Sequence, residues 1–153
     1  MKLLDILPED LVIPSLKGQT KDELLRELAE HMAAVHTEIN ARQLYEVLWE
    51  RERLGSTAIG DGIAIPHGKL PGLPAMLAAF ARHVQGVDFE SLDGNPTRLF
   101  FLLVAPEDSV GPHLKALARV SRLLKDPSFR ERLLIAPDRA ALYRGIREED
   151  DKY

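Results

Sequence analysis

The segment of this chain with the clearest chemical potential is residues 60–70, which contain a single histidine, His67. His67 follows a short apolar run that ends at Pro66, and Gly68 comes directly after it. Proline fixes its own φ at about −65° and favours an extended residue before it, so a stiff strand should present the imidazole at its end. Gly68 leaves room there for a partner's backbone. A neutral imidazole can be phosphorylated directly. A group-transfer histidine is therefore one interpretation, and a turn histidine without a role is the alternative.

Two further residues have chemistry that suits a phosphoryl group. His113 follows Gly111-Pro112 at the expected start of a helix, where unpaired N–H groups and the positive end of the helix dipole favour a phosphate. Arg51 could hold phosphoryl oxygens with its two-pronged guanidinium. Spacing alone favours a capping or surface role for His113. Arg51, within Glu50-Arg-Glu-Arg53, is also compatible with a solvated helix end.

The remaining histidines and the common catalytic motifs offer no competing site. His31 and His36 are five residues apart, about 140° around a helix, so we expect two helix-surface histidines, and we also place His83 at the surface. A P-loop fails because five residues separate Gly62 from Gly68, and Leu70 stands where Ser or Thr is required. A third dinucleotide-binding glycine, a His-Glu-x-x-His zinc motif and a Gly-x-Ser-x-Gly elbow are all absent.

Length and composition restrict the class of protein. The 153 residues are 45% apolar and 29% charged, which is typical of one globular domain. The formal charge of −4 argues against non-specific nucleic-acid binding. No apolar run reaches the roughly 18 residues of a membrane span, and we find no signal peptide. The absence of cysteine excludes disulfides and thiolate chemistry and is compatible with a reducing cytosol.

The elements that must position these residues can be placed from caps and periodicity. Thr20 with Glu23, and Asn40 with Gln43, form capping boxes that open two helices, the second of which has Arg51 in its last turn. Short strands are expected at residues 57–59 and 63–65, and longer ones at 76–84 and 99–104. Later helices are expected from about residue 112 to 124, from 127 to 134 after an Asp126 cap, and from 138 to 146. This order predicts a single α/β domain, a mixed sheet flanked by helices, over residues 1–147. A charged tail over 148–153 would then have nothing to bury.

Four stretches of this sequence resemble one family, the IIA components of the bacterial phosphoenolpyruvate-dependent phosphotransferase system, of the fructose/mannitol and nitrogen-regulatory type. Residues 51–57 resemble its Arg-Glu-x-x-x-Ser-Thr segment, and residues 60–69 resemble its phosphorylation motif. Residues 93–106 and 113–120 resemble its central strand and its second-histidine helix. One departure is Ala58, which stands where the family has glycine and suggests that this position needs no positive φ.

The resemblance implies a cytoplasmic domain with a mixed sheet and helices on both of its sides. It implies that His67 is phosphorylated by a histidine phosphocarrier protein, that His113 and Arg51 stabilise the phosphate, and that no cofactor, nucleotide or metal is needed. Apolar residues such as Leu54, Leu70 and Leu73 would form the docking surface for that carrier.

Two functions are compatible with this resemblance. In a nitrogen-regulatory IIA protein, the phosphorylation state would control a partner such as a kinase or a potassium transporter. In a sugar-type IIA protein, the phosphate would pass to a IIB domain for sugar uptake. The chain has no IIB-like cysteine site and no membrane-spanning IIC segment, which favours the regulatory role. A degenerate relative without the chemistry is disfavoured by the intact His67, His113 and Arg51.

Overall fold

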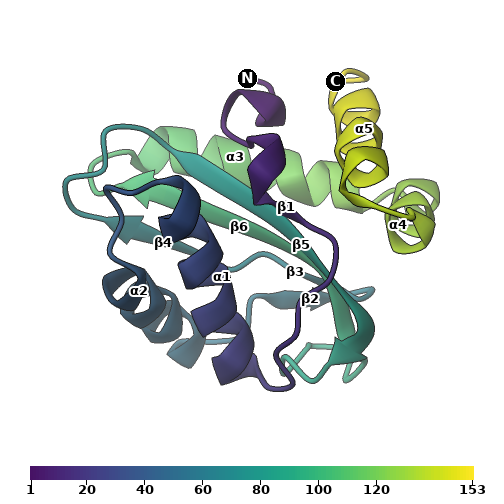
Figure 1. The fold of residues 1–153 in the computed structure, drawn as a ribbon, viewed down its shortest axis with the longest axis horizontal. Helices are drawn as coiled ribbons and strands as arrows, with labels where there is room; N and C mark the ends of the chain where they lie inside the picture. Colours follow the sequence, from purple (N-terminus) through teal and green to yellow (C-terminus); the bar gives the residue numbers. More distant parts are fainter.

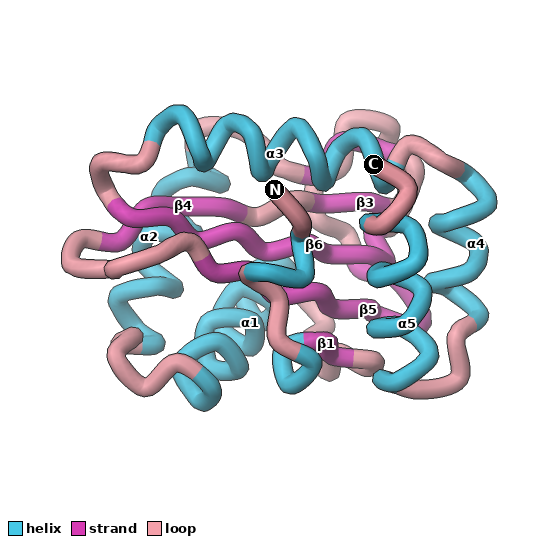
Figure 2. The backbone as a smooth tube through the Cα atoms, turned by 90° about the horizontal axis from the view of Figure 1, so that it is seen from above, coloured by secondary structure: helices cyan, strands magenta, loops and turns pink.

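A mixed six-stranded sheet runs through the centre of the molecule, and helices cover both of its faces (Figure 1). The computed structural model describes residues 1–153. Helices α1 (Lys21–Val35) and α2 (Ala41–Arg53) pack on one face. Helices α3 (Val110–Leu124), α4 (Pro127–Ile135) and α5 (Arg139–Asp150) lie on the other side, together with two short 3-10 helices, Leu3–Asp5 and Glu9–Leu11 (Figure 2). The predicted α/β architecture is confirmed.

The sheet is organised around β6 (Thr97–Pro106), whose side chains are buried from Leu99 to Ala105. Along one edge, β6 pairs antiparallel with β5 (Leu77–Val87), which in turn pairs with β1 (Val12–Ile13). Along its other edge, β6 pairs in parallel with two short strands, β3 (Ile63–Ala64) and β4 (His67–Leu70). Strand β2 (Ala58–Gly60) continues the sheet beyond β3. Burial on both faces explains why β6 is apolar throughout.

The predicted starts of α1, α2 and α4 are correct because local side chains satisfy the first free N–H groups. Thr20 accepts a hydrogen bond from the Glu23 amide at 3.1 Å, and Asn40 accepts one from the Gln43 amide at 3.0 Å. Asp126 caps α4 in the same way, with Pro127 as the first helical residue. The Glu23 carboxylate accepts from the Gln19 amide and not from Thr20, so the first capping box is only half formed.

Strand β4 was not predicted. The sequence analysis ends the preceding strand at residue 65 and allows His67 to be a turn residue, because Pro66 and Gly68 are turn-forming residues. In the structure His67 is the first residue of a strand whose Cα atoms pair from His67↔Leu103 to Leu70↔Pro106. A distant partner strand overrides the local signal. Strand β4 pairs only with β6, so its outer edge is unpaired. Ala58 has a negative φ, as its identity predicts.

The prediction of a charged tail without burial is wrong for two of its residues. Helix α5 continues to Asp150, and Glu149 and Asp150 are both buried. The Asp150 carboxylate accepts a hydrogen bond from Arg119 Nε at 2.9 Å and one from the Leu4 amide at 3.3 Å. The tail therefore does have partners, and they lie on α3 and in the N-terminal segment.

Candidate functional site

Three elements that are far apart in the sequence meet around one cavity of about 490 Å³. The last turn of α2 contributes Arg51, the first residue of β4 is His67, and the first turn of α3 contributes His113. The sheet brings them together because β4 follows the edge of β6, and β6 leads into α3. The structure thus places all three predicted site residues in one site.

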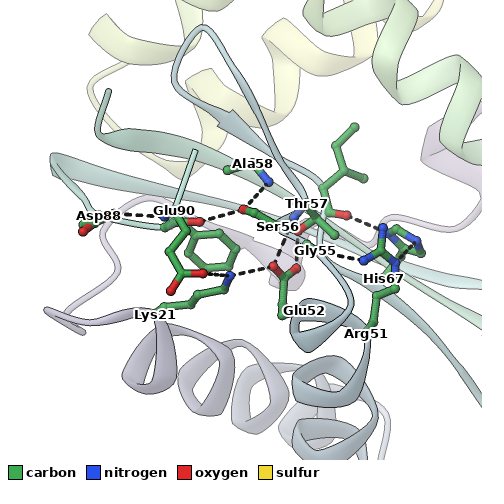
Figure 3. Close-up of polar contacts among 12 residues, drawn as sticks. Lys21, Arg51, Glu52, Gly55, Ser56, Thr57, Ala58, His67, Asp88 and Glu90 are labelled. Atoms are coloured by element: carbon green, nitrogen blue, oxygen red, sulfur yellow. Dashed lines mark hydrogen bonds and ion pairs between the residues drawn. The ribbon is translucent and has the colours of Figure 1, made fainter. Parts of the chain in front are cut away.

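The imidazole of His67 is half-buried, and both of its nitrogens have partners. Nδ1 lies 2.9 Å from the carbonyl oxygen of Ile65, and Nε2 lies 3.2 Å from Nε of Arg51 (Figure 3). An arginine can only donate, so Nε2 must be the acceptor of that bond. The proton of the neutral ring therefore resides on Nδ1, where Ile65 accepts it. This tautomer leaves the lone pair on Nε2, directed towards Arg51.

The guanidinium of Arg51 is held at two points. Nε donates to His67, and a terminal nitrogen donates to the Gly55 carbonyl oxygen at 2.8 Å (Figure 3). Both acceptors are uncharged, so neither of these bonds neutralises the cation. A phosphoryl group on His67 would meet a planar, charged donor with N–H groups to spare.

His113 is neither a capping residue nor a surface residue, contrary to the alternative suggested by its spacing. Its side chain is only 5% exposed, because α3 begins at Val110 and turns the imidazole inward against the site. The His113 and His67 rings meet edge to face, with centroids 5.5 Å apart and planes at 75°. Nε2 of His113 is buried without a hydrogen-bond partner. A buried, unsatisfied nitrogen is costly and suggests a partner that arrives with the substrate.

Burial favours the neutral form of both imidazoles. Desolvation lowers the pKa of His67, and the nearby charge of Arg51 lowers it further, although the bond to Ile65 acts in the opposite direction. Desolvation likewise lowers the pKa of His113, with smaller contributions from His67 and Lys69. An unprotonated His67 has the free lone pair that a nucleophile needs.

Lys69 was missed by the sequence reasoning. It is exposed and lines the cavity. Residues i and i+2 of a strand point to the same side, so reading residues 67–70 as a strand would have placed Lys69 beside His67. The turn interpretation concealed this relation.

Gly68 has a structural role that the sequence analysis did not predict. A Cβ atom at this position would lie 2.5 Å from Cγ1 of Val47 on α2. The glycine therefore accommodates the close packing of α2 on β4.

The three predicted docking residues differ in exposure. Leu54 is 85% exposed at the rim of the cavity, whereas Leu70 and Leu73 are buried. The other exposed apolar side chains of the rim are Val110 and Leu114.

The other histidines lie outside this site. His31 and His36 are partly exposed on and just after α1. His83 is buried, contrary to the predicted surface position. Both of its ring nitrogens are hydrogen-bonded, one to the Gly18 carbonyl and the other to the Gly86 amide, which offsets the cost of burial. No group of three histidine or acidic side chains is arranged to hold a metal ion. None of the helices combines the length and the apolar character that crossing a membrane would require.

The arrangement suits transfer of a tetrahedral anion. A neutral nucleophilic nitrogen, an arginine fork and a second imidazole with a free nitrogen converge on an open cavity that has an apolar rim. Transfer of a phosphoryl group needs mainly positioning and charge stabilisation, both of which these groups can supply. Fold and site together define an α/β domain in which two imidazoles and an arginine meet at one cavity.

The family model of the phosphoenolpyruvate-dependent sugar phosphotransferase system EIIA 2 matches residues 5–149, and the chain belongs to that family. It is 46% identical to a nitrogen regulatory protein of Bradyrhizobium diazoefficiens over 143 residues. These aligned residues cover 94% of this chain and 93% of that protein. The crystal structure of the nitrogen regulatory protein IIA-Ntr from Neisseria meningitidis superposes with a TM-score of 0.87 at 30% identity, over 93% of this chain and 97% of that one.

A sugar-specific relative is also similar to the chain. The fructose-specific EIIABC component of Bacillus subtilis is 36% identical over 151 residues, which cover 98% of this chain but only 24% of that larger protein. The family is therefore established, and its members include both regulatory and sugar-specific proteins.

Proposed function

We propose that this protein is a phosphohistidine carrier, in which His67 accepts a phosphoryl group from the phosphohistidine of a small carrier protein. The observation that carries the proposal is the His67 ring, whose Nε2 accepts from Nε of Arg51 at 3.2 Å while His113 packs against it. A structural histidine would not need two cationic or imidazole neighbours and an open cavity.

The reacting atom in this proposal is Nε2 of His67. Its lone pair attacks the phosphorus atom, and the bond between phosphorus and the carrier's imidazole breaks, with its electron pair returning to that nitrogen. The Nδ1 proton of His67 stays hydrogen-bonded to the Ile65 carbonyl and keeps the ring oriented. No nucleotide or metal takes part in this step, because the phosphoryl group arrives already activated on a histidine.

Arg51 and His113 stabilise the transferred group in this mechanism. When Nε2 becomes bonded to phosphorus it can no longer accept from Arg51, so the guanidinium turns its N–H groups to the phosphoryl oxygens. The unpartnered Nε2 of His113 gains an oxygen to which it can donate. A nearby dianion raises the pKa of an imidazole, which favours the donating, protonated form of His113.

The downstream role that we propose is regulatory and cytoplasmic. The similarity to nitrogen regulatory proteins along nearly the whole chain supports a switch whose phosphorylation state controls a partner such as a kinase or a transporter. The second candidate is a sugar-type IIA protein that passes the phosphate to a IIB domain. The fructose-specific relative is the observation in its favour.

Phosphorylation by phosphoenolpyruvate, enzyme I and the carrier protein tests the first step. We expect one acid-labile phosphoryl group on the wild-type protein and none on His67→Ala, whereas His31→Ala, outside the cavity, is labelled normally. Labelling of His67→Ala would refute the site.

Two further measurements test the downstream role. Partners captured with the unphosphorylated protein should differ from those captured with His67→Asp, which imitates the charge. Identical partners, together with fast transfer to a IIB domain, would favour the sugar-type alternative.

A further inference from the structure

A buried carboxylate lies directly beside the site, in the last turn of α2. Glu52 follows Arg51 in the sequence and is only 4% exposed. A negative charge at the C-terminal end of a helix opposes the helix dipole, and burying it costs more free energy still. Helix stability therefore does not explain why a glutamate is placed here.

Glu52 reaches across the loop that connects α2 to β2 (Figure 3). One carboxylate oxygen accepts a hydrogen bond from the Thr57 amide at 3.1 Å, and the other accepts from the Thr57 hydroxyl. Lys21 supplies the compensating charge, with its Nζ 3.0 Å from the carboxylate and its side chain 10% exposed. The charge is thus paired and bonded at both oxygens, which fixes Thr57 relative to α2.

From Thr57 a chain of hydrogen bonds leads to the imidazole of His67. The Thr57 carbonyl accepts from the Ile65 amide at 3.0 Å. The Ile65 carbonyl in turn accepts the Nδ1 proton of His67 at 2.9 Å. This last bond, together with the Arg51 bond to Nε2, sets which ring nitrogen is protonated, so Glu52 is linked to the tautomer of His67 through two residues, Thr57 and Ile65.

The same loop also holds Arg51. The Gly55 carbonyl, two residues before Thr57, accepts from the Arg51 guanidinium at 2.8 Å. With Thr57 anchored to Glu52, the loop over residues 54–56 is fixed at both of its ends. The Gly55 oxygen then holds Arg51 in the observed orientation, in which Nε is directed at His67 (Figure 3).

We propose that Glu52 is a positioning residue for phosphoryl transfer, which orients His67 through Thr57 and Ile65 and orients Arg51 through the Gly55 loop. This inference rests on the proposed function of His67. Glu52 touches neither the phosphoryl group nor the reacting nitrogen, and it acts by fixing the geometry of the two groups that do. Displacement of catalytic groups by about 1 Å can slow a reaction by on the order of 100-fold.

Glu52→Gln tests the proposal, with Glu46→Gln as the matched control. Glu46 is an exposed carboxylate on the same helix, paired only with Arg42. Phosphorylation by the phosphorylated carrier is measured well below the melting temperature of every variant. We expect Glu52→Gln to be labelled about tenfold or more slowly and Glu46→Gln to be labelled like the wild type. Nitrogen-15 NMR of the unphosphorylated protein should show the Nδ1–H tautomer of His67 in the wild type and a mixture in Glu52→Gln.

Thr57→Val provides a milder second variant if Glu52→Gln does not fold, because it removes only the hydroxyl link. It should show the same two changes at smaller size. A purely structural role would lower the melting temperature but leave the tautomer and the labelling rate unchanged, and that result would overturn the proposal. If the wild type is not labelled, the proposed function fails. The positioning role is tested separately, because an unchanged tautomer of His67 in both variants overturns it whether or not the protein is labelled.

Discussion

Replacing Gly68 by alanine offers the sharpest test of how α2 and β4 build the site. The added Cβ would lie 2.5 Å from Cγ1 of Val47, whereas unstrained carbon atoms sit about 3.5 to 4.0 Å apart. Helix and strand must separate by roughly 1 Å, or Val47 must leave its place. Val47 is four residues before Arg51 and therefore lies on the same face of α2. A displacement of the helix at Val47 should move Arg51 away from His67.

The expected cost follows from two opposing effects. Overpacking of a well-packed contact costs about 1 to 3 kcal/mol. Gly68 does not have a positive φ, so alanine is compatible with its backbone and returns about 0.4 to 1 kcal/mol by restricting the unfolded chain. The net loss should lie between about 0 and 2.6 kcal/mol, with a central value of about 1.3 kcal/mol. For a domain of this size, the central value corresponds to a melting temperature lower by about 3 to 5 °C.

The assay combines thermal or denaturant unfolding with the rate of labelling by the phosphorylated carrier. Gly68→Ala should be less stable and should be labelled more slowly. Val47→Ala removes the methyl group that the new Cβ meets, so adding Gly68→Ala to Val47→Ala should cost almost nothing. The coupling between the two substitutions should be on the order of 1 kcal/mol.

Two results would refute this reasoning. If Gly68→Ala kept full stability and showed no coupling to Val47→Ala, the close approach of α2 would not be what requires the glycine. If it slowed labelling without loss of stability, and Val47→Ala gave no rescue, the glycine would serve the approach of the carrier instead.

Three further predictions concern charge and burial. Both site histidines have lowered pKa values in the folded protein. Between those values and about 6.5, the unfolded chain therefore binds more protons than the folded one. The free energy of unfolding should fall as the pH falls through this range. Denaturant titrations at several pH values check this, and a His67→Ala/His113→Ala variant that kept the same slope would contradict it. Asp150→Ala leaves Arg119 without its buried partner and should cost about 3 kcal/mol in unfolding experiments; an unchanged midpoint would show that the pair is unimportant. His113→Ala should still be labelled, but roughly 100-fold more slowly in single-turnover assays, and wild-type rates would remove its stabilising role.

Local signals in the sequence predicted those parts of the fold that are determined locally. The caps of α1, α2 and α4 depend on residues three or fewer positions away, and they were recognised correctly. Strand β4 and the burial of Asp150 depend on partners more than 30 residues away in the sequence, Leu103 and Arg119. Such pairings leave no periodic pattern in a segment of four residues, so a turn and a free tail were predicted instead.

The candidate site likewise combines features that local sequence predicts with features that depend on distant partners. His67, Arg51 and His113 could be selected by residue type and by family resemblance, but their convergence depends on β6, which lies between β4 and α3. Glu52 and Thr57 belong to the segment 51–57 that carries the resemblance, yet nothing in their types indicates a buried link. Ser56 in the same segment donates to the Phe89 carbonyl at 2.8 Å. A contact with residue 89 cannot be inferred from positions 51–57 alone.

The unpaired outer edge of β4 has a consequence for the behaviour of the protein at high concentration. An exposed strand edge is a template on which another chain can add a strand, and growth from such edges leads to aggregation. The cavity opens beside this edge, so a helix or loop cannot simply cover it. Pro66 and Pro71 flank the strand, and neither has an N–H group to offer an incoming chain. The strand has only four residues, and exposed Lys69 places a charge within it. The sequence around the cavity thereby protects the unpaired edge of β4 against self-association.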